Sequence, residues 1–428
     1  MKKNTFIKST FILLVGGFIT KVLSMIIKII MTRSIKTNGM ALYSLTLPTY
    51  NLFITLTTIG NPNVVSKLVS EKKISNRKIL NSSFLLSVIF SLILFLILIL
   101  SAKRISSILH NKELYLPILS IGISLPFISI SSSIRGYFFG KQNMIPHVIS
   151  NFIEQITRIL IFIYILPKIN TIKYKVTLII LTNVICEIVS IIILYSYLPR
   201  KINLNELSFK LDKDLTKEIL SISFPTTLNR LIGTISGFIE PILLTNLLIY
   251  KGIDKNFIQY EYGLINGYVM PLLLLPSFFS MAISQSIIPV ISNSYVNKNF
   301  KNIKKKIKQV NLLSFSIGLI YTVIILLNPE YFLKLIYNTN EGVNYVKLLS
   351  PFFILLYVQG PNTSIMQAMN KAKTSAKHTF EGIIIKFIVL ITFSLLNFHI
   401  YSLIFSIIVN IVYVTIRNYF SIKKTISN

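Results

Sequence analysis

Long apolar runs alternate with short polar segments from one end of this chain to the other. Each run has about 20 mostly apolar residues, which is the length that a helix needs to cross a bilayer. The pattern therefore predicts twelve membrane-spanning helices, an even number that places both termini on the same side. The expected spans are 6–32, 41–69, 79–101, 114–134, 148–167, 176–198, 218–247, 262–291, 310–328, 346–369, 378–396 and 399–420.

The composition agrees with a polytopic membrane protein. Of the 428 residues, 53% are hydrophobic and only 14% are charged, whereas about a quarter of a soluble protein is charged. The mean hydropathy is +0.68. The net charge of +30 raises the question of a nucleic-acid partner, but most lysines lie in the connecting segments, where anionic lipid headgroups attract them. We therefore expect these charges to face a lipid bilayer and no nucleic acid.

The connecting segments fall into two alternating sets with unequal charge. More Lys and Arg residues lie in the set that holds the two termini and the segments 70–78, 135–147, 199–217, 292–309 and 370–377. Because cytoplasmic loops of membrane proteins are enriched in these residues, we expect both termini in the cytoplasm. The chain is thus expected to be a multi-pass protein of the cytoplasmic membrane.

The longest of these segments, 199–217, lies halfway along the chain and is interpreted as a cytoplasmic linker. It separates two expected bundles of six helices, 1–198 and 218–428. The halves also resemble each other, because FITKVLSMI at 18–26 matches TLNRLIGTI at 227–235 and sets Lys21 against Arg230. Six spans per half predict a parallel repeat, with a pseudo-twofold axis along the membrane normal and a cavity between the halves. The expected fold class is all-α.

Three cations in the expected spans are candidates for the lining of that cavity. Lys21 and Lys28 belong to the first span, which has no acidic residue, and Arg230 belongs to the seventh. A Lys at bilayer depth costs about 3 kcal/mol, so it usually faces a protein interior or a watery cavity. Both lysines lie on nearly one face of a helix, about two turns apart, which favours an anionic cargo. Arg230 suits a phosphate group, and Gly233 and Gly237 leave room beside it for a helix or a ligand.

Four further charged residues within the expected spans admit two interpretations. Glu154 and Arg158 are spaced i, i+4 and can form a structural pair on one helix. Glu187 and Glu240 can balance a buried cation, or they can bind a coupling proton or sodium ion. The sequence does not distinguish these roles.

No catalytic residue, metal site or cofactor is expected. The chain has no P-loop, CxxC, HExxH or GxSxG motif, and each of these motifs is the signature of a particular chemistry. Cys186 is the one cysteine, so no intramolecular disulfide can form. An ATP-driven pump or a membrane enzyme is therefore not expected.

Three segments resemble a known group of transporters. They are RGYFFGKQNMIPHVISNFIEQITR at 135–158, ITKVLSMIIKIIMTRSIKTNGMALYSLTLPTYNLFITLTTIGNPNVVSKLVSEKK at 19–73 and SFPTTLNRLIGTISGFIEPILL at 223–244. On these segments, the chain resembles the polysaccharide-transporter branch of the multidrug/oligosaccharidyl-lipid/polysaccharide (MOP) exporter superfamily. Within this branch it is most similar to the stage V sporulation protein B-like group, which is related to the lipid II flippase. The resemblance spans nearly the whole chain and implies a two-lobed, MATE-like fold.

This resemblance implies a flippase that works by alternating access. Its cargo would be an anionic undecaprenyl-diphosphate-linked glycan precursor for peptidoglycan, spore cortex or another polysaccharide. By motif, Lys21, Lys28 and Arg230 would line the cavity, and relatives suggest coupling to the membrane potential or to a gradient of H+ or Na+. Implied partners are the bilayer, the lipid-linked oligosaccharide and cell-wall synthesis enzymes. Many relatives have two further spans that form a groove for the lipid tail, so a chain of twelve spans needs another path for the tail.

Two alternatives stay open. A multidrug/cation antiporter of the same superfamily would need carboxylates at its substrate cavity, and the acid-free first span argues against this reading. A non-transporting membrane scaffold for cell-wall synthesis would not need cations inside the membrane. Replacing Lys21 and Lys28 by Gln and testing complementation separates a scaffold from a transporter.

Overall fold

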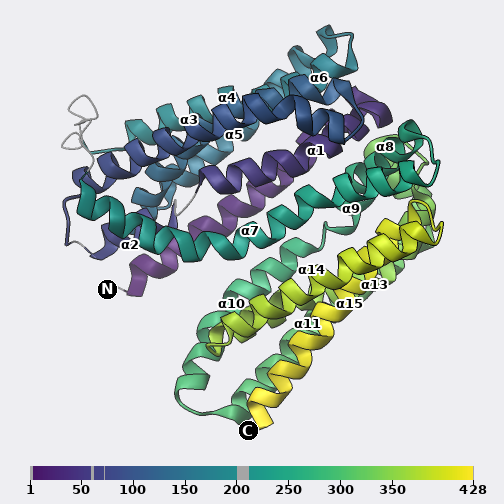
Figure 1. The fold of residues 1–428 in the computed structure, drawn as a ribbon. Helices are drawn as coiled ribbons and strands as arrows, with labels where there is room; N and C mark the ends of the chain where they lie inside the picture. The colour runs from purple at the N-terminus through teal and green to yellow at the C-terminus, as the bar shows by residue number, and fades with distance from the viewer. Residues whose placement is uncertain (1–2, 59–61, 72, 200–211, 428) are drawn as a thin grey trace. The chain divides into compact units, whose positions relative to one another are not determined.

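The computed structural model describes residues 3–58, 62–71, 73–199 and 212–427, and in these it contains helices and no strand (Figure 1). The predicted all-α architecture is confirmed. The chain divides into two compact units, Met1–Phe238 and Ile239–Asn428, which are called unit 1 and unit 2 below. The division falls inside helix α7 (Lys213–Tyr250). Most of the expected linker 199–217 lies outside the described residues.

Unit 1 consists of long helices joined by short turns. Within it α3 packs against α4, α4 against α6, and α1 against α5. Its elements are α1 (Lys3–Thr57), α2 (Asn63–Glu71), α3 (Asn76–Ile108), the 3-10 turn η1 (Lys112–Leu114), α4 (Tyr115–Gly140), α5 (Ile145–Tyr164), the 3-10 turn η2 (Leu166–Lys168), α6 (Ile172–Ser196) and the first part of α7.

Unit 2 is arranged around α13, because α10, α11 and α15 all pack against this helix (Figure 1). Helix α14 runs beside α15. The elements are the end of α7, α8 (Lys255–Leu264), the π-helical turn η4 (Ile265–Val269), α9 (Met270–Leu273), α10 (Ser277–Val296), α11 (Phe300–Leu327), α12 (Pro329–Tyr337), α13 (Val343–Ala368), α14 (Ala372–Leu395) and α15 (Tyr401–Ser427).

Helix α3 shows why these elements suit a membrane. On its inner face, the hydroxyls of Ser83 and Ser87 lie 3.2 and 3.1 Å from Ser133 Oγ of α4. On its outer face, Leu96 and Leu100 are 60% and 80% exposed. Small polar side chains let membrane helices approach each other closely, and the exposed leucines contact lipid chains. Helix α3 therefore presents polar side chains to α4 and apolar side chains to the surrounding lipid.

Ten helices of the described part of the chain are long and apolar enough to cross a membrane, and one bent pair brings the number to eleven. The longest candidate, Val15–Thr57, has 43 residues. It would rise about 64 Å, twice the ~30 Å of a hydrocarbon core. The helix is broken at Lys36, where φ is 54°. Helix α1 as a whole, Lys3–Thr57, therefore contains the first expected span, 6–32, and the first part of the second, 41–69.

The bent pair corresponds to the eighth expected span. Its halves, Lys255–Leu273 and Ser277–Val296, meet at 53°. Pro276 lies at the break and has no amide hydrogen to continue the helix. The hydroxyl of Tyr357 in α13 donates to the carbonyl of Leu273 at 2.5 Å. Because lipid offers no hydrogen bonds, a broken span needs such partners within the protein.

The expected connection 135–147 is wrong at its start. Helix α4 continues to Gly140 and carries Arg135 inside unit 1. The residues after Arg135 are mostly apolar, and Tyr137 and Phe138 are buried. Burial of these rings extends the helix beyond the predicted end of the span.

The expected connection 292–309 is also wrong over most of its length. Helix α10 ends at Val296 and α11 begins at Phe300, so the lysine-rich run 301–309 is helical. Ile303 and Ile307 are buried one turn apart in this run. Lysine is itself a good helix former, so the charged face does not oppose the helix.

Candidate functional site: a buried charge network

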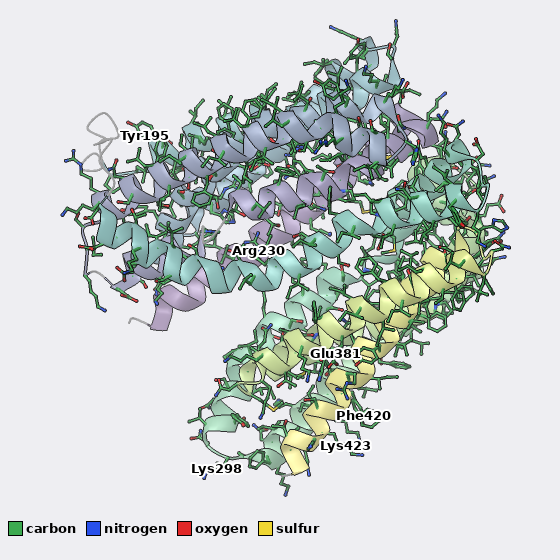
Figure 2. The ribbon with its side chains drawn as sticks, viewed as in Figure 1. Tyr195, Arg230, Lys298, Glu381, Phe420 and Lys423 are labelled. Atoms are coloured by element: carbon green, nitrogen blue, oxygen red, sulfur yellow. The ribbon has the colours of Figure 1, made fainter. Side chains whose placement is uncertain are left out.

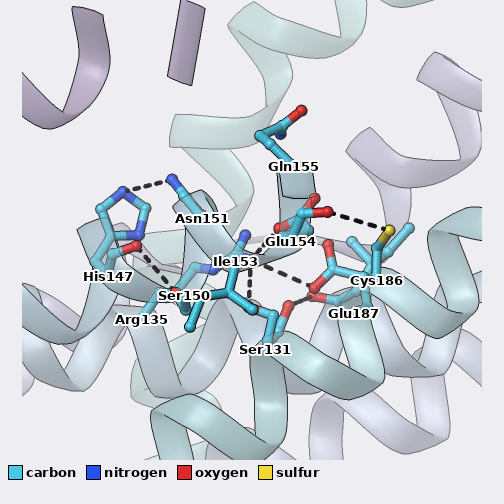
Figure 3. A network of polar contacts seen from close by, with 12 residues as sticks. Ser131, Arg135, His147, Ser150, Asn151, Ile153, Glu154, Gln155, Cys186 and Glu187 are labelled. Carbon is cyan, nitrogen blue, oxygen red and sulfur yellow. Dashed lines mark hydrogen bonds and ion pairs between the residues drawn. The ribbon is translucent and has the colours of Figure 1, made fainter. Parts of the chain in front are cut away.

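Arg135 of α4 is the centre of a polar network inside unit 1 (Figure 3). Its Nη2 donates to Glu154 Oε2 at 3.1 Å, to Glu187 Oε2 at 3.5 Å and to Ser190 Oγ at 2.8 Å. Glu154 belongs to α5, whereas Glu187 and Ser190 belong to α6. A single side chain therefore joins three consecutive helices of the chain.

Arg158 holds the other oxygen of Glu154. Its Nη2 donates to Glu154 Oε1 at 3.0 Å and to Asn183 Oδ1 at 3.1 Å. Its Nη1 donates to Gln155 Oε1 at 3.4 Å. The amide of Asn183 in turn donates to the carbonyl of Ile180 at 3.0 Å. Arg158 thus links α5 to α6 a second time, along the same helix pair.

Two arginines and two glutamates make the network electrically neutral. The side chains of Arg135 and Arg158 are each 18% exposed, and those of Glu154 and Glu187 are 11% and 10% exposed. A lone charge at this depth would lose most of its hydration without compensation. Among the described residues, no group of three or more His, Cys, Asp or Glu side chains is placed to hold a metal ion. The arrangement fixes helix positions and keeps both carboxylates in ion pairs.

Two further groups border the network (Figure 3). Cys186 is fully buried, and its Sγ donates to the backbone carbonyl of Glu154 at 3.5 Å. His147 Nε2 lies 3.3 Å from Asn151 Nδ2, and its ring packs edge-on against Phe139 at a centroid distance of 4.8 Å. These contacts pack Cys186 and His147 against neighbouring residues at the edge of the network.

Lys28 contacts an aromatic ring of its own helix, Tyr43, and that ring lies near the same network. Its Nζ is 5.4 Å from the centroid of the Tyr43 ring, which is a cation–π distance. Tyr43 and Tyr50 of α1 are both close enough to Arg158 for electrostatic interaction. The predicted cavity residue Lys28 is therefore connected to the ion pairs by a ring and has no direct bond to a carboxylate.

The other two predicted cavity cations are exposed. Lys21 lies on the surface of α1, and Arg230 lies on the surface of α7 (Figure 2). Arg230 Nη2 donates to Thr58 Oγ1 at 3.4 Å. Within the residues that the structure describes, neither of them nor Lys28 forms an ion pair with a carboxylate. That these three cations contact a cargo stays a prediction.

Three glycines near these cations lie against open space. A Cβ added at Gly17, Gly233 or Gly237 would meet no heavy atom within 4 Å. Gly17 precedes Lys21 by one helical turn, and Gly233 follows Arg230 by three residues. In unit 1, each of these two cations therefore borders a helix surface that no described neighbour covers.

Unit 2 holds a separate buried ion pair. The Nζ of Lys386 in α14 bonds Glu240 Oε2 in the last part of α7. The two side chains are 15% and 10% exposed. Glu240, whose role the sequence left open, thus has a cation partner within its own unit.

Sequence reasoning placed Glu154 beside Arg158 but missed Arg135 and did not name Lys386 as the partner of Glu240. One signal for Arg135 was available. Two glutamates and one arginine in the fifth and sixth spans leave one negative charge without a partner, and a buried charge needs one. No comparable local signal identifies Lys386, because it lies 146 residues from Glu240.

Comparison with known proteins decides the family. The family described as "Polysaccharide biosynthesis protein" matches residues 6–295, and the family described as "MatE" matches residues 266–392. This chain belongs to the polysaccharide biosynthesis protein family. The predicted resemblance to the MOP exporter superfamily is confirmed.

Two relatives from Bacillus subtilis (strain 168) show how far the similarity extends. Stage V sporulation protein B is 30% identical over 401 residues, which are 90% of this chain and 77% of that protein. Lipid II flippase MurJ is 24% identical over 419 residues, which are 89% of this chain and 76% of that protein. The similarity to both thus covers both units.

A solved structure shows the same fold. An inward-facing multidrug resistance MATE family transporter of the MOP superfamily has a TM-score of 0.74 and 15% identity, and the match covers 95% of this chain and 94% of that chain. MATE transporters have twelve helices in two bundles. The family member described here is therefore a multi-pass membrane protein with a MATE-like fold.

Proposed function

We propose that this chain is an alternating-access flippase for an anionic, undecaprenyl-diphosphate-linked glycan precursor. Its relatives include a protein named for sporulation and one named lipid II flippase, and its family is described by polysaccharide biosynthesis. In this proposal both termini lie in the cytoplasm, and the cargo moves from the inner to the outer leaflet of the cytoplasmic membrane. Cell-wall synthesis enzymes would supply the precursor and use it afterwards.

The distribution of charge inside the spans carries the proposal. Each of the three buried glutamates among the described residues pairs with an Arg or a Lys. By contrast, Lys21, Lys28 and Arg230 have no carboxylate partner there. The uncompensated charge is positive, which suits a diphosphate. An exporter of cations would need a free carboxylate instead.

The three cations would share the recognition of the diphosphate. The planar guanidinium of Arg230 can donate two parallel hydrogen bonds to one phosphate group. Its present partner, Thr58 Oγ1, is a neutral oxygen at 3.4 Å, so the charge of Arg230 is not cancelled. Lys21 and Lys28 act as point charges, and the open surfaces at Gly17 and Gly233 leave room for the headgroup.

The proposal assigns the buried glutamates to the architecture of each unit. Glu154, Glu187 and Glu240 are already held by guanidinium or ammonium groups. Binding of a coupling proton or sodium ion to them would first have to break these ion pairs. The membrane potential acting on the charged cargo and its cations is therefore the favoured energy source, and it needs no cofactor.

The test is reconstitution of the purified chain in liposomes with fluorescent lipid-linked glycan precursors. We expect loss of label from one leaflet with one class of precursor. Lys21→Gln, Lys28→Gln and Arg230→Gln should each slow this by about tenfold, the worth of one charge-assisted hydrogen bond. Lys103→Gln and Lys251→Gln remove charge from exposed lysines and serve as controls.

Three outcomes would overturn the proposal. Full flipping by the triple Gln variant would show that the cations do not hold the cargo. Export of an organic cation, with no precursor flipped, would favour an antiporter. Complementation of a deletion strain by the triple Gln variant, with no flipping in liposomes, would favour a scaffold.

A further inference from the structure

Unit 2 has a groove of about 990 Å³ between α11, α13 and α15. Most of its wall is apolar, with Leu312 and Phe315 from α11 and Ile416 and Phe420 from α15. Phe420 is labelled in Figure 2. These four side chains are exposed in the described structure. They lie on helices that are long and apolar enough to cross a membrane, so the groove runs along membrane-spanning segments.

One end of the groove is basic. Lys304 and Lys308 line it from the first turns of α11, and Lys423 lines it from the last turns of α15. These two helix ends lie together, because Ile303 and Ile426 belong to the same core cluster. The described lining residues include no Asp or Glu. The charge at this end therefore fits an anionic group.

The groove has the length of one membrane leaflet. Lys304 and Phe315 both line it and are 11 positions apart on α11. At 1.5 Å per residue, this separation is about 16 Å. Half of a bilayer's hydrocarbon core is about 15 Å. An occupant with its headgroup at the lysines would thus extend its chains along the apolar wall to the middle of the membrane.

Two amide side chains lie between the basic end and the apolar wall. Asn362 of α13 lines the groove and is 0% exposed, yet neither its Nδ2 nor its Oδ1 has a hydrogen-bond partner among the described residues. Asn311 Oδ1, three residues beyond Lys308, has none either. Buried amides nearly always have partners. Their presence indicates that the occupant supplies polar atoms just below its headgroup.

We propose that this groove binds a diacyl anionic phospholipid. Its phosphate lies among Lys304, Lys308 and Lys423, an ester carbonyl accepts a hydrogen bond from Asn362 Nδ2, and its acyl chains cover the apolar wall. A polyprenyl diphosphate has no ester carbonyl to accept from Asn362 Nδ2, and a soluble anion would leave the apolar wall empty. This site is separate from the proposed cargo residues and does not depend on the proposed function.

The test is native mass spectrometry of the full-length chain released from detergent with added lipids of known composition. We expect phosphatidylglycerol to bind at least about tenfold more tightly than phosphatidylcholine with the same acyl chains, because the choline ammonium cancels the phosphate charge whereas phosphatidylglycerol keeps a net negative charge for the lysines to attract. The variant Lys304→Gln/Lys308→Gln/Lys423→Gln should remove this preference. The matched variant Lys301→Gln/Lys305→Gln/Lys424→Gln, which changes exposed lysines outside the groove, should keep it.

The amide residue provides a second, independent arm. Asn362→Leu fills the same space without a polar atom, so it should fold normally and weaken phosphatidylglycerol binding. A photoreactive phosphatidylglycerol should crosslink to peptides of α11 and α15. Equal binding of both lipids, equal effects of the two triple variants, or stronger binding of undecaprenyl phosphate than of phosphatidylglycerol would overturn the proposal. So would binding of inorganic phosphate alone, or a lipid-free dimer that buries the groove.

Discussion

Arg135 Nη2 lies 3.1 Å from Glu154 Oε2, and this ion pair joins α4 to α5 within unit 1. The same guanidinium reaches Glu187 on α6 at 3.5 Å. No other bond described for unit 1 brings charged groups from three helices together through one side chain. The stability of this unit should therefore depend strongly on Arg135.

Cys186 provides a direct measure of that stability. It is the one cysteine of the chain, it is fully buried, and it lies against the network. A buried thiol reacts only when the protein around it opens. We expect a thiol-reactive dye to label the native protein very slowly and the heated protein rapidly. Rapid labelling of native protein at room temperature would contradict the described packing.

Arg135→Gln should destabilise unit 1 by about 3–5 kcal/mol, because it leaves Glu187 as a buried charge with no partner. The measurement is the midpoint of thermal unfolding, followed by dye labelling of Cys186. The double variant Arg135→Gln/Glu187→Gln removes both charges and should recover much of the loss. A single variant as stable as the parent would show that the ion pair does not hold the helices.

Lys386→Met should destabilise unit 2 in the same way, by about 3–5 kcal/mol, because it leaves Glu240 unpaired. Glu240→Gln/Lys386→Met should restore the unfolding midpoint, measured by the temperature at which the protein aggregates. The double variant also separates the two roles that the sequence allowed for Glu240. If it folds and still flips its cargo, the pair is structural; if it folds but is inactive at every pH, Glu240 takes part in coupling.

Gly136→Ala and Gly233→Ala should have opposite effects. A Cβ at Gly136 would lie 2.6 Å from the backbone carbonyl oxygen of Pro62, which cannot move aside easily. Overpacking of this kind costs about 1–3 kcal/mol. At Gly233 the Cβ meets no neighbour, so Ala should stabilise the helix by up to about 1 kcal/mol. Thermal unfolding of the two variants side by side tests the described packing of α4.

Tyr43→Phe should preserve the position of Lys28, whereas Tyr43→Leu should not. The ammonium lies 5.4 Å from the centre of the ring, and only an aromatic face attracts it, by about 0.5–2 kcal/mol. We expect Tyr43→Leu alone to lower the unfolding midpoint and the flipping rate. Equal behaviour of the two variants would mean that the ring acts only by its volume.

The helices were predictable because their apolar runs are long. In lipid, a spanning segment must satisfy its own backbone hydrogen bonds, and an α-helix does this. Their ends were less predictable. Arg135 was predicted to begin a connecting segment, because a charged side chain usually lies in water and not within a membrane span. The structure satisfies that charge inside the protein, with carboxylates that lie 19 and 52 residues further along the chain.

The candidate site was predictable only where it is local. Glu154 and Arg158 share one helical face, so their spacing indicates the pair. The partner of Glu240 lies on α14, 146 residues along the chain, and no pattern in the sequence shows that these two side chains meet. The break at Lys36 was equally hidden, because its left-handed φ of 54° occurs at a residue type with no preference for it.

The neutrality of the Arg135 network has an electrical consequence. One elementary charge gains about 2.3 kcal/mol for each 100 mV through which it moves, but a body whose fixed charges cancel gains nothing. Moving the two arginines and two glutamates together through the membrane potential therefore requires no electrical work. The same holds for the Lys386–Glu240 pair. Voltage can act on this protein only through charges that lack a partner, and on the ions that those charges carry.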